Sequence, residues 1–260
     1  MINVNTIFFD IDGTIYDAKN DRIPPKTLLA LKTLQNNGIK IFLASGRSLP
    51  AIINGKLDKD ICWDGYVCSN GACLHHSDHR LLQGSFFTDI QLDAIFNMVK
   101  EFNMGLCVQS ATEVFSPFGI NDHMIEAFKF FKNPIPLYKP FENEKIAMAL
   151  AFQYKGFDYR VLETIKDITT VEGKANYADV MQIGITKATG IRKIRELMGL
   201  KNGSIMSFGD ADNDLEMIID ADISVAMGNG TDNIKNNADH ITSAVEDEGV
   251  YKALKHFKLI

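Results

Sequence analysis

The chain has 260 residues, 46% of them hydrophobic and 23% charged, a composition typical of a soluble globular protein with one large domain or a core with an inserted domain. The formal net charge of -6 and the pI near 5.5 exclude a basic surface for nucleic acid or anionic membranes. No apolar stretch reaches about 18 residues, which excludes a membrane-spanning helix.

The N-terminus and the cysteines indicate the compartment. The chain enters an apolar strand at once, without a basic segment followed by an apolar one, so we expect no secretion signal. The cysteines show no CxxC spacing and lie in apolar contexts, so we expect buried free thiols at Cys62, Cys68, Cys73 and Cys107. Both features predict a cytoplasmic protein. We expect a monomer, although no feature specifies the oligomeric state.

The first 70 residues alternate between strand and helix patterns. Strands are predicted at 7–9, 39–44 and 66–69, with helices after Pro24-Pro25 and at about 50–57. This alternation is typical of a parallel sheet with crossover helices. Ligands bind beyond the carboxyl ends of such strands. The residues found there are Asp10 and Asp12 after the first strand, Ser45 after the second and Asn70 after the third.

From residue 72 the pattern changes to antiparallel strands mixed with helices. A hairpin is predicted at 72–76 and 81–82. Helices follow at about 89–102, 122–131 and 157–166, and strands at about 106–109, 113–116, 146–153, 169–172 and 177–183, with a loop at 134–140. We therefore place a separate, inserted α+β domain at 83–183.

The parallel pattern returns after the insert. A helix begins at Lys187, a strand at 204–208 runs into the acidic segment 209–214, and a helix continues to about residue 221. A strand at 223–227, a short helix before Ile241 and a last helix at 249–257 complete the chain. The predicted fold is α/β, a Rossmann-like three-layer core with a parallel sheet built from 1–82 and 184–260.

The carboxylates at the strand ends suit a metal and a phosphate. Asp10 and Asp12 leave the first strand on the same side, although two like charges about 4 Å apart repel by roughly 4 kcal/mol at an effective dielectric near 20. Asp210 and Asp214 are four residues apart at a strand-to-helix turn, so they lie on one side of the first helical turn. Oxygen ligands of this kind favour Mg²⁺.

Together these segments resemble the haloacid dehalogenase-like superfamily of phosphotransferases over essentially the whole chain. The residues at 10–14 resemble its DxDGT motif, Ser45 its Ser/Thr motif, Lys187 its Lys motif and the segment 209–214 its GDxxND motif. The insert is similar to the large cap of the Cof-like branch, whose better known members are sugar-phosphate phosphatases. Two departures are Ser45 where Thr is usual and Ala188 where Gly is frequent.

The resemblance implies a role for each residue. Asp10 attacks phosphorus to form an aspartyl-phosphate, and Asp12 protonates the leaving group and then activates water. Ser45 and Lys187 cradle the phosphoryl oxygens. The implied metal residues are Asp10, the Asp12 backbone carbonyl, Asp210 and Asp214. For Asp214 direct binding of the ion stays open, although the resemblance favours a supporting position. The expected substrate contacts are Gly46, Arg47, Asn213 (which would also orient Asp214 or Lys187) and Asp179.

These residues predict a Mg²⁺-dependent phosphatase of small phosphomonoesters, with sugar phosphates as the expected substrates. The alternatives are a phosphomutase, a pyridoxal-phosphate or nucleotide phosphatase, and a phosphosugar-binding regulator without turnover. A regulator has no need of intact Asp10, Asp12, Lys187 and Asp210, which argues against it.

Two other motifs are given structural interpretations. The histidines at 75, 76 and 79 are interpreted as exposed hairpin polarity rather than a metal site. The segment Gly228-Asn229-Gly230 lacks the third glycine of a dinucleotide fingerprint and is interpreted as a strand-to-helix turn near the site.

Overall fold

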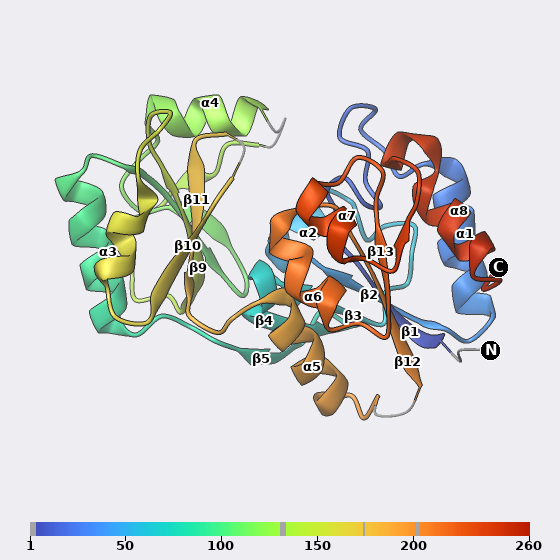
Figure 1. The fold of residues 1–260 in the computed structure, drawn as a ribbon. Coiled ribbons are helices and arrows are strands. Elements are labelled where there is room, and N and C mark those ends of the chain that lie inside the picture. The colour runs from blue at the N-terminus through green and yellow to red at the C-terminus, as the bar shows by residue number, and fades with distance from the viewer. Residues whose placement is uncertain (1–3, 131–133, 174, 201–202) are drawn as a thin grey trace. The chain divides into compact units, whose positions relative to one another are not determined.

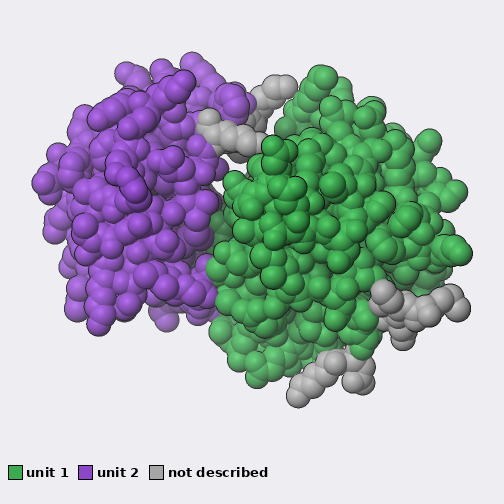
Figure 2. Space-filling model, viewed as in Figure 1, with its two compact units in different colours: residues 1–83, 186–260 green, residues 84–185 purple. Residues whose placement is uncertain are grey.

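A computed structural model describes residues 4–130, 134–173, 175–200 and 203–260. The chain forms two compact units, one from residues 1–83 and 186–260 and the other from 84–185 (Figure 2). The second unit is thus inserted into the first, and its bounds lie beside those that the sequence predicts for the insert.

The first unit contains an eight-stranded sheet in the order β14-β13-β12-β1-β2-β3-β4-β5 (Figure 1). The strands from β14 to β3 are parallel, and β4 runs antiparallel to β3. The strands are β1 (Val4–Phe9), β2 (Lys40–Ala44), β3 (Gly65–Cys68), β4 (Cys73–His76), β5 (Leu81–Gly84), β12 (Ser204–Gly209), β13 (Ile223–Ala226) and β14 (His240–Ile241).

Helices cover both faces of this sheet, which gives the three layers. The α-helices are α1 (Pro25–Asn36), α2 (Leu49–Asn54), α5 (Lys187–Leu197), α6 (Leu215–Ile219), α7 (Asp232–Asn237) and α8 (Gly249–His256). Short 3-10 helices are η1 (Ser69–Gly71), η3 (Asp212–Asp214) and η4 (Val245–Asp247). On one face, α5 packs over Phe8 and Phe42, whose rings stack with centroids 4.9 Å apart. On the other, Phe9 stacks on Phe208 at the same distance, and α1 and α8 lie side by side (Figure 1).

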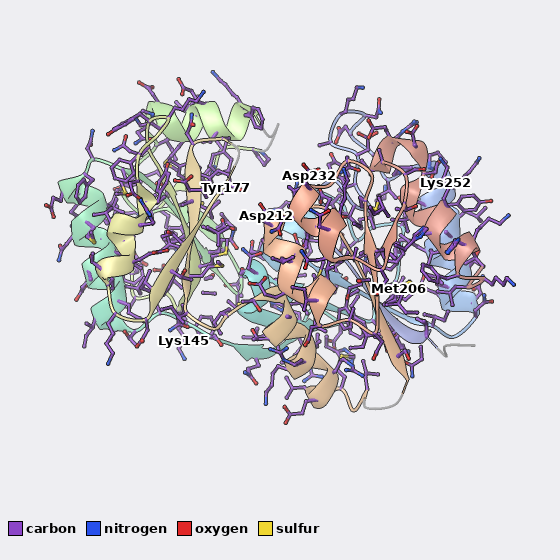
Figure 3. The ribbon with its side chains drawn as sticks, in the orientation of Figure 1. Lys145, Tyr177, Met206, Asp212, Asp232 and Lys252 are labelled. Atoms are coloured by element: carbon purple, nitrogen blue, oxygen red, sulfur yellow. The ribbon has the colours of Figure 1, made fainter. Side chains whose placement is uncertain are left out.

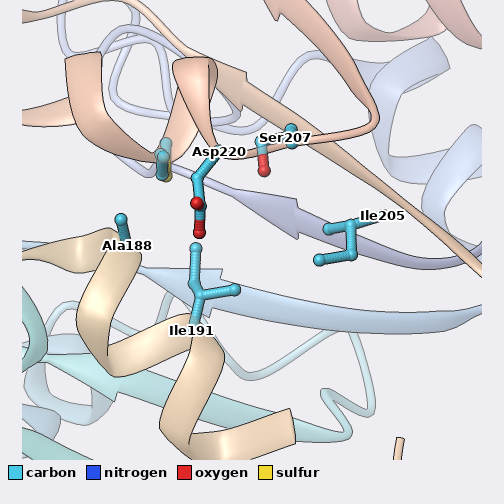
Figure 4. Close-up of a pocket in the computed structure, with 7 residues that line it drawn as sticks. Ala188, Ile191, Ile205, Ser207 and Asp220 are labelled. Atoms are coloured by element: carbon cyan, nitrogen blue, oxygen red, sulfur yellow. The ribbon is translucent and has the colours of Figure 1, made fainter. Parts of the chain in front are cut away.

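Because helices cover both faces, the central strands are buried on both sides. Met206 of β12 is fully buried among the strands, whereas Lys252 of α8 is exposed (Figure 3). Ala188, the departure from the family's frequent glycine, packs with Ile191 of its own helix and Ile205 of β12 in one apolar cluster (Figure 4). The extra methyl group is therefore accommodated by the core.

The register brings the carboxyl ends of the central strands to one edge. Phe9 pairs with Leu43 of β2 and with Phe208 of β12. The residues that follow each of these strands therefore meet at the same edge, as the parallel pattern predicts.

The second unit has a six-stranded sheet in the order β10-β11-β9-β6-β7-β8. Its strands are β6 (Gly105–Ser110), β7 (Val114–Ser116), β8 (Leu137–Tyr138), β9 (Ile146–Phe152), β10 (Ile168–Glu172) and β11 (Tyr177–Gln182), and its helices are α3 (Asp89–Glu101), α4 (Asp122–Phe130) and the 3-10 helix η2 (Tyr159–Thr164). Helix α3 packs on one face through Leu92, Ile95 and Phe96, and α4 packs on the other through Met124 and Ala127. The predicted α/β core with an α+β insert is confirmed.

Two elements of the insert differ from the sequence prediction. The predicted helix at 157–166 is a 3-10 helix, because the β-branched Val161, Thr164 and Ile165 disfavour an α-helix and β10 begins shortly afterwards. The predicted loop at 134–140 contains the short strand β8, which pairs in parallel with β7.

Two burial predictions were wrong. Cys62 is exposed, because its neighbours Ile61 and Trp63 take the buried positions in the extended segment before β3; the other three cysteines are buried free thiols. His75 is only 2% exposed, since its β4 position faces the core beside Tyr66, while His79 is exposed as expected. None of the described helices has the length and apolar content needed to cross a bilayer.

Gly71, the last residue of η1, lies against the start of α5. Its φ is +102°, and a Cβ there would lie 2.1 Å from the Thr186 carbonyl oxygen. We expect Gly71→Ala to destabilise the protein by about 3 kcal/mol, because left-handed strain of about 1–2 kcal/mol adds to a clash with backbone. Gly38→Ala is the control, since Gly38 has φ +78° with no atom within 4 Å of the added Cβ, and should cost only the strain. Urea unfolding measures the free energy of unfolding of both variants. Equal decreases in the two would contradict a clash at Gly71.

Candidate active site

A buried lysine joins two carboxylates at the end of β1. The Lys187 ammonium donates to Asp10 Oδ1 at 2.6 Å and to Asp214 Oδ1 at 2.5 Å. Lys187 is only 1% exposed and is the first residue of α5, whose N-cap Thr186 forms a capping box with Thr189. The cap fixes where α5 begins and therefore where the lysine side chain enters the site.

Three carboxylates converge around this lysine. Asp10, Asp210 and Asp214 are buried, and each offers an oxygen within 4.8 Å of the others. Asp214 Oδ1 accepts from Lys187, while its Oδ2 accepts from the backbone N–H groups of Asp210 and Ala211 at 3.0 and 3.1 Å. Both Asp214 oxygens therefore already have donors, which favours a supporting position for Asp214 over direct metal ligation.

The cluster is electrostatically costly without a cation. Burial, and then the negative charge of Asp214, raise the pKa of Asp10 well above its usual value, and Lys187 opposes this only in part. Burial alone would lower the pKa of Lys187, but the two carboxylates raise it above its usual value. A divalent cation beside Asp10 and Asp210 would reverse the pKa shift of Asp10.

The Asp210 carboxylate occupies the space above Gly13. Gly13 has φ +90°, and a Cβ there would lie 2.4 Å from Asp210 Oδ2. Thr14 donates to Asp210 Oδ1 at 3.4 Å, and Asn229 donates to Oδ2 at 3.3 Å. The Gly-Thr pair after the two aspartates thus gives Asp210 both room and a donor.

Asp12 lies at the mouth of the site and is bound by arginine. Arg47 Nε and Nη2 each donate to one Asp12 oxygen at 2.7 Å. The Asp12 side chain is 46% exposed, and that of Arg47 is 19% exposed. Arg47 was predicted as a substrate contact, but its partner in the structure is Asp12.

The turn after β2 is held by the turn after β3. Ser45 is buried, its backbone carbonyl accepts from the Asn70 N–H at 3.0 Å, and its hydroxyl accepts from the Arg47 N–H at 3.1 Å. A Cβ on Gly46 would lie 3.2 Å from Asn70 Oδ1, so Gly46 lets the two turns approach closely. Asn213 donates to the same Asn70 oxygen at 3.2 Å, rather than to Asp214 or Lys187 as predicted.

Three residues that the sequence analysis places near the site, without a role in it, make contacts there. Thr14 and Asn229 contact Asp210, and Asn70 contacts Asn213. Asn70 adopts φ +52°, a left-handed conformation that Asn tolerates better than most residues. Its place after the third strand was predicted, but its contact with Asn213 was not. The remaining predicted residue, Asp179, lies in the second unit on β11 opposite Leu150 and is 9% exposed.

Comparisons with known proteins show the family of this chain. A family model for haloacid dehalogenase-like hydrolases matches residues 7–254. The chain is 27% identical to the 5-amino-6-(5-phospho-D-ribitylamino)uracil phosphatase YitU of Bacillus subtilis. The match extends over 265 residues and covers 96% of each chain.

Solved structures show the same fold. The chain is similar to the subclass IIB sugar phosphatase BT4131, with a TM-score of 0.84 and 29% identity over 98% of this chain and 100% of that one. It is also similar to the phosphatase BT1666 of Bacteroides thetaiotaomicron, with a TM-score of 0.88 and 26% identity over 100% and 96% of the two chains. The resemblance seen in the motifs is confirmed: the chain belongs to the haloacid dehalogenase-like hydrolases, and it is a phosphatase of that superfamily.

Proposed function

We propose that this phosphatase hydrolyses small phosphomonoesters, preferably sugar phosphates, with Mg²⁺ and through an aspartyl-phosphate on Asp10. The observation that carries the proposal is the Asp10 carboxylate at the end of β1, bound to Lys187 and grouped with Asp210 and Asp214. A nucleophile, a fixed cation and a carboxylate set for a metal are the parts that phosphoryl transfer requires.

The donor set fits Mg²⁺. The cluster consists of carboxylate oxygens, and the raised pKa of Asp10 indicates that its charged form lacks sufficient compensation. Asp10 and Asp210 would hold the ion with the backbone carbonyl of Asp12, and Asp214 would support them. When bound, the ion supplies positive charge to the phosphoryl oxygens.

The side chains divide the reaction into two displacements. The Asp10 carboxylate attacks phosphorus, the ester P–O bond breaks, and Asp12 gives a proton to the leaving alkoxide. Asp12 then takes a proton from water, whose oxygen attacks the same phosphorus and breaks its bond to Asp10. Lys187 and the Ser45 hydroxyl stabilise charge on the phosphoryl oxygens in both steps. Because Arg47 binds both Asp12 oxygens, we now assign Arg47 to holding Asp12 as well as to substrate contact.

Substrate preference is assigned to the cap. Gly46 and Asn213 lie beside the phosphoryl-binding residues, so we propose that they contact the phosphate, which every phosphomonoester shares. Asp179 is a buried carboxylate on the cap sheet and a suitable acceptor for sugar hydroxyls. The names of the relatives support a polyol phosphate, since one is a sugar phosphatase and another acts on a phosphoribityl compound. The three buried free thiols support a cytoplasmic enzyme, and we propose that it is monomeric.

Asp10→Asn should abolish turnover, because the amide cannot form the covalent intermediate. Asp12→Asn should lower kcat by about 10²–10⁴-fold, the usual effect of losing a general acid and base. Steady-state phosphate release measures both. The control is Asp158→Asn, the same change at an exposed residue of the cap, which should keep normal activity. Wild-type turnover by Asp10→Asn would contradict the covalent mechanism.

The same Asp10→Asn variant should be more stable than the wild type in EDTA. Burial raises the pKa of Asp10 in the folded protein. Below the unfolded pKa of about 3.9 the carboxyl group is protonated in both states and does not affect stability. As the pH rises through the folded pKa, the ionised carboxylate lowers the free energy of unfolding. At pH 7 we expect a melting temperature a few degrees higher for the variant, and this difference should vanish near pH 3.

Asp158→Asn is the control, because the pKa of Asp158 is shifted in the opposite direction. Hydrogen bonds from Arg160 lower the pKa of Asp158, so its neutralisation should bring no such gain. Saturating Mg²⁺ should reverse the order of wild type and Asp10→Asn, because the ion compensates the wild-type charge. Equal melting curves in EDTA at pH 7 would contradict the electrostatic account.

A screen of sugar phosphates, nucleotides, phospho-amino acids and pyridoxal phosphate should show the highest kcat/KM for hexose or pentose phosphates. Asp179→Asn should raise KM for those sugars about tenfold, since a hydrogen bond to a charged group contributes roughly 1.5–3 kcal/mol. Glu172→Gln, a change at an exposed residue of the neighbouring strand β10, is the control. A tenfold preference for a nucleotide or pyridoxal phosphate would overturn the sugar assignment. Isomerisation that depends on a bisphosphate would instead overturn the proposed hydrolytic reaction.

A further inference from the structure

Asn229 makes three hydrogen bonds beside the acidic cluster. Its amide nitrogen donates to the Gly13 carbonyl at 2.9 Å and to Asp210 Oδ2 at 3.3 Å. Its amide oxygen accepts from the Val245 N–H at 2.9 Å. Both N–H groups and the oxygen of one side chain are therefore used, and they connect the turn after β1, the end of β12 and the start of η4.

These contacts constrain the direction in which Asp210 points. One Asp210 oxygen accepts from Thr14 and the other from Asn229. Thr14 is 1% exposed and belongs to the same turn as Gly13. Because Asn229 is anchored at Gly13 and Val245, its donor toward Asp210 is held in place rather than free to rotate. The carboxylate is thus oriented from two sides.

We propose that Asn229 is a positioning residue for Asp210, which it holds in the orientation that binds the cation. This inference rests on the proposed function, which assigns Mg²⁺ to Asp10 and Asp210. Partners that orient metal ligands typically change metal affinity by 10–100-fold when removed. Asn229 is exposed, so water can replace its bonds to the backbone, and its loss should affect ion binding more than folding.

The test compares Asn229→Ala with Asn233→Ala. Asn233 lies on the adjacent helix α7 and donates to the exposed Asp212 at 3.2 Å, not to Asp210, so it is the same change without the proposed role. The readout is the melting temperature of EDTA-treated protein titrated with MgCl₂, which requires no turnover. We expect Asn229→Ala to need at least about tenfold more Mg²⁺ for half of the stabilisation, and Asn233→Ala to match the wild type.

Each outcome is decisive. If Mg²⁺ stabilises the wild type and Asn229→Ala at the same concentration, the inference is wrong and the proposed function stands. If Mg²⁺ stabilises neither, the metal site of the proposed function is wrong and the inference falls with it. An equal shift in Asn233→Ala would indicate a general disturbance of the loop and would also overturn the role of Asn229.

A second variant keeps the inference testable if Asn229→Ala does not fold. If Asn229→Ala lacks the wild-type circular dichroism spectrum in EDTA, Asn229→Ser takes its place, because a serine hydroxyl keeps some polarity at the surface but has fewer donors and a shorter reach than the amide. The same loss of Mg²⁺ affinity is expected for it, and wild-type Mg²⁺ affinity in a folded Asn229→Ser would contradict the inference.

Discussion

The site depends on one buried ammonium shared by two carboxylates. Lys187 is almost fully buried and donates to both Asp10 and Asp214. Removing Lys187 would leave both buried carboxylates without their cation, at a cost of about 3–5 kcal/mol. The three carboxylates and one lysine leave a net negative charge, which favours the binding of a cation. The ion pair also keeps the Asp10 carboxylate beside the Lys187 ammonium, a group that attracts phosphoryl oxygens.

The fold supplies this cluster from distant parts of the chain. Asp10 and Asp210 follow two adjacent parallel strands, β1 and β12, while Lys187 begins a helix on one face of the sheet. Gly71 lets η1 approach the start of that helix. The inserted unit lies in the chain between Ser45 and Lys187. The proposed function therefore assigns the phosphoryl chemistry to the core and the substrate preference to the insert.

Much of the core and the reactive residues could be predicted from the sequence, because their signals are local. Apolar strands followed directly by Asp10, Ser45 and Asp210 predict a parallel sheet and its ligand-binding edge. The missed contacts are not local: Asn229 reaches Gly13 across 216 residues of sequence, and Arg47 reaches Asp12 across 35. Burial of His75 and exposure of Cys62 likewise follow from which side of a chain segment faces the core, which residue type alone does not decide.

The most direct test of the account is chemical identification of the intermediate. Asp12→Asn enzyme mixed with a sugar phosphate and Mg²⁺, quenched in acid and digested, should yield a phosphorylated peptide in which mass spectrometry assigns the phosphate to Asp10. The label should be absent without Mg²⁺ and in the Asp10→Asn variant. Phosphate on another residue, or labelling that persists in Asp10→Asn, would contradict the assignment of Asp10 as the nucleophile.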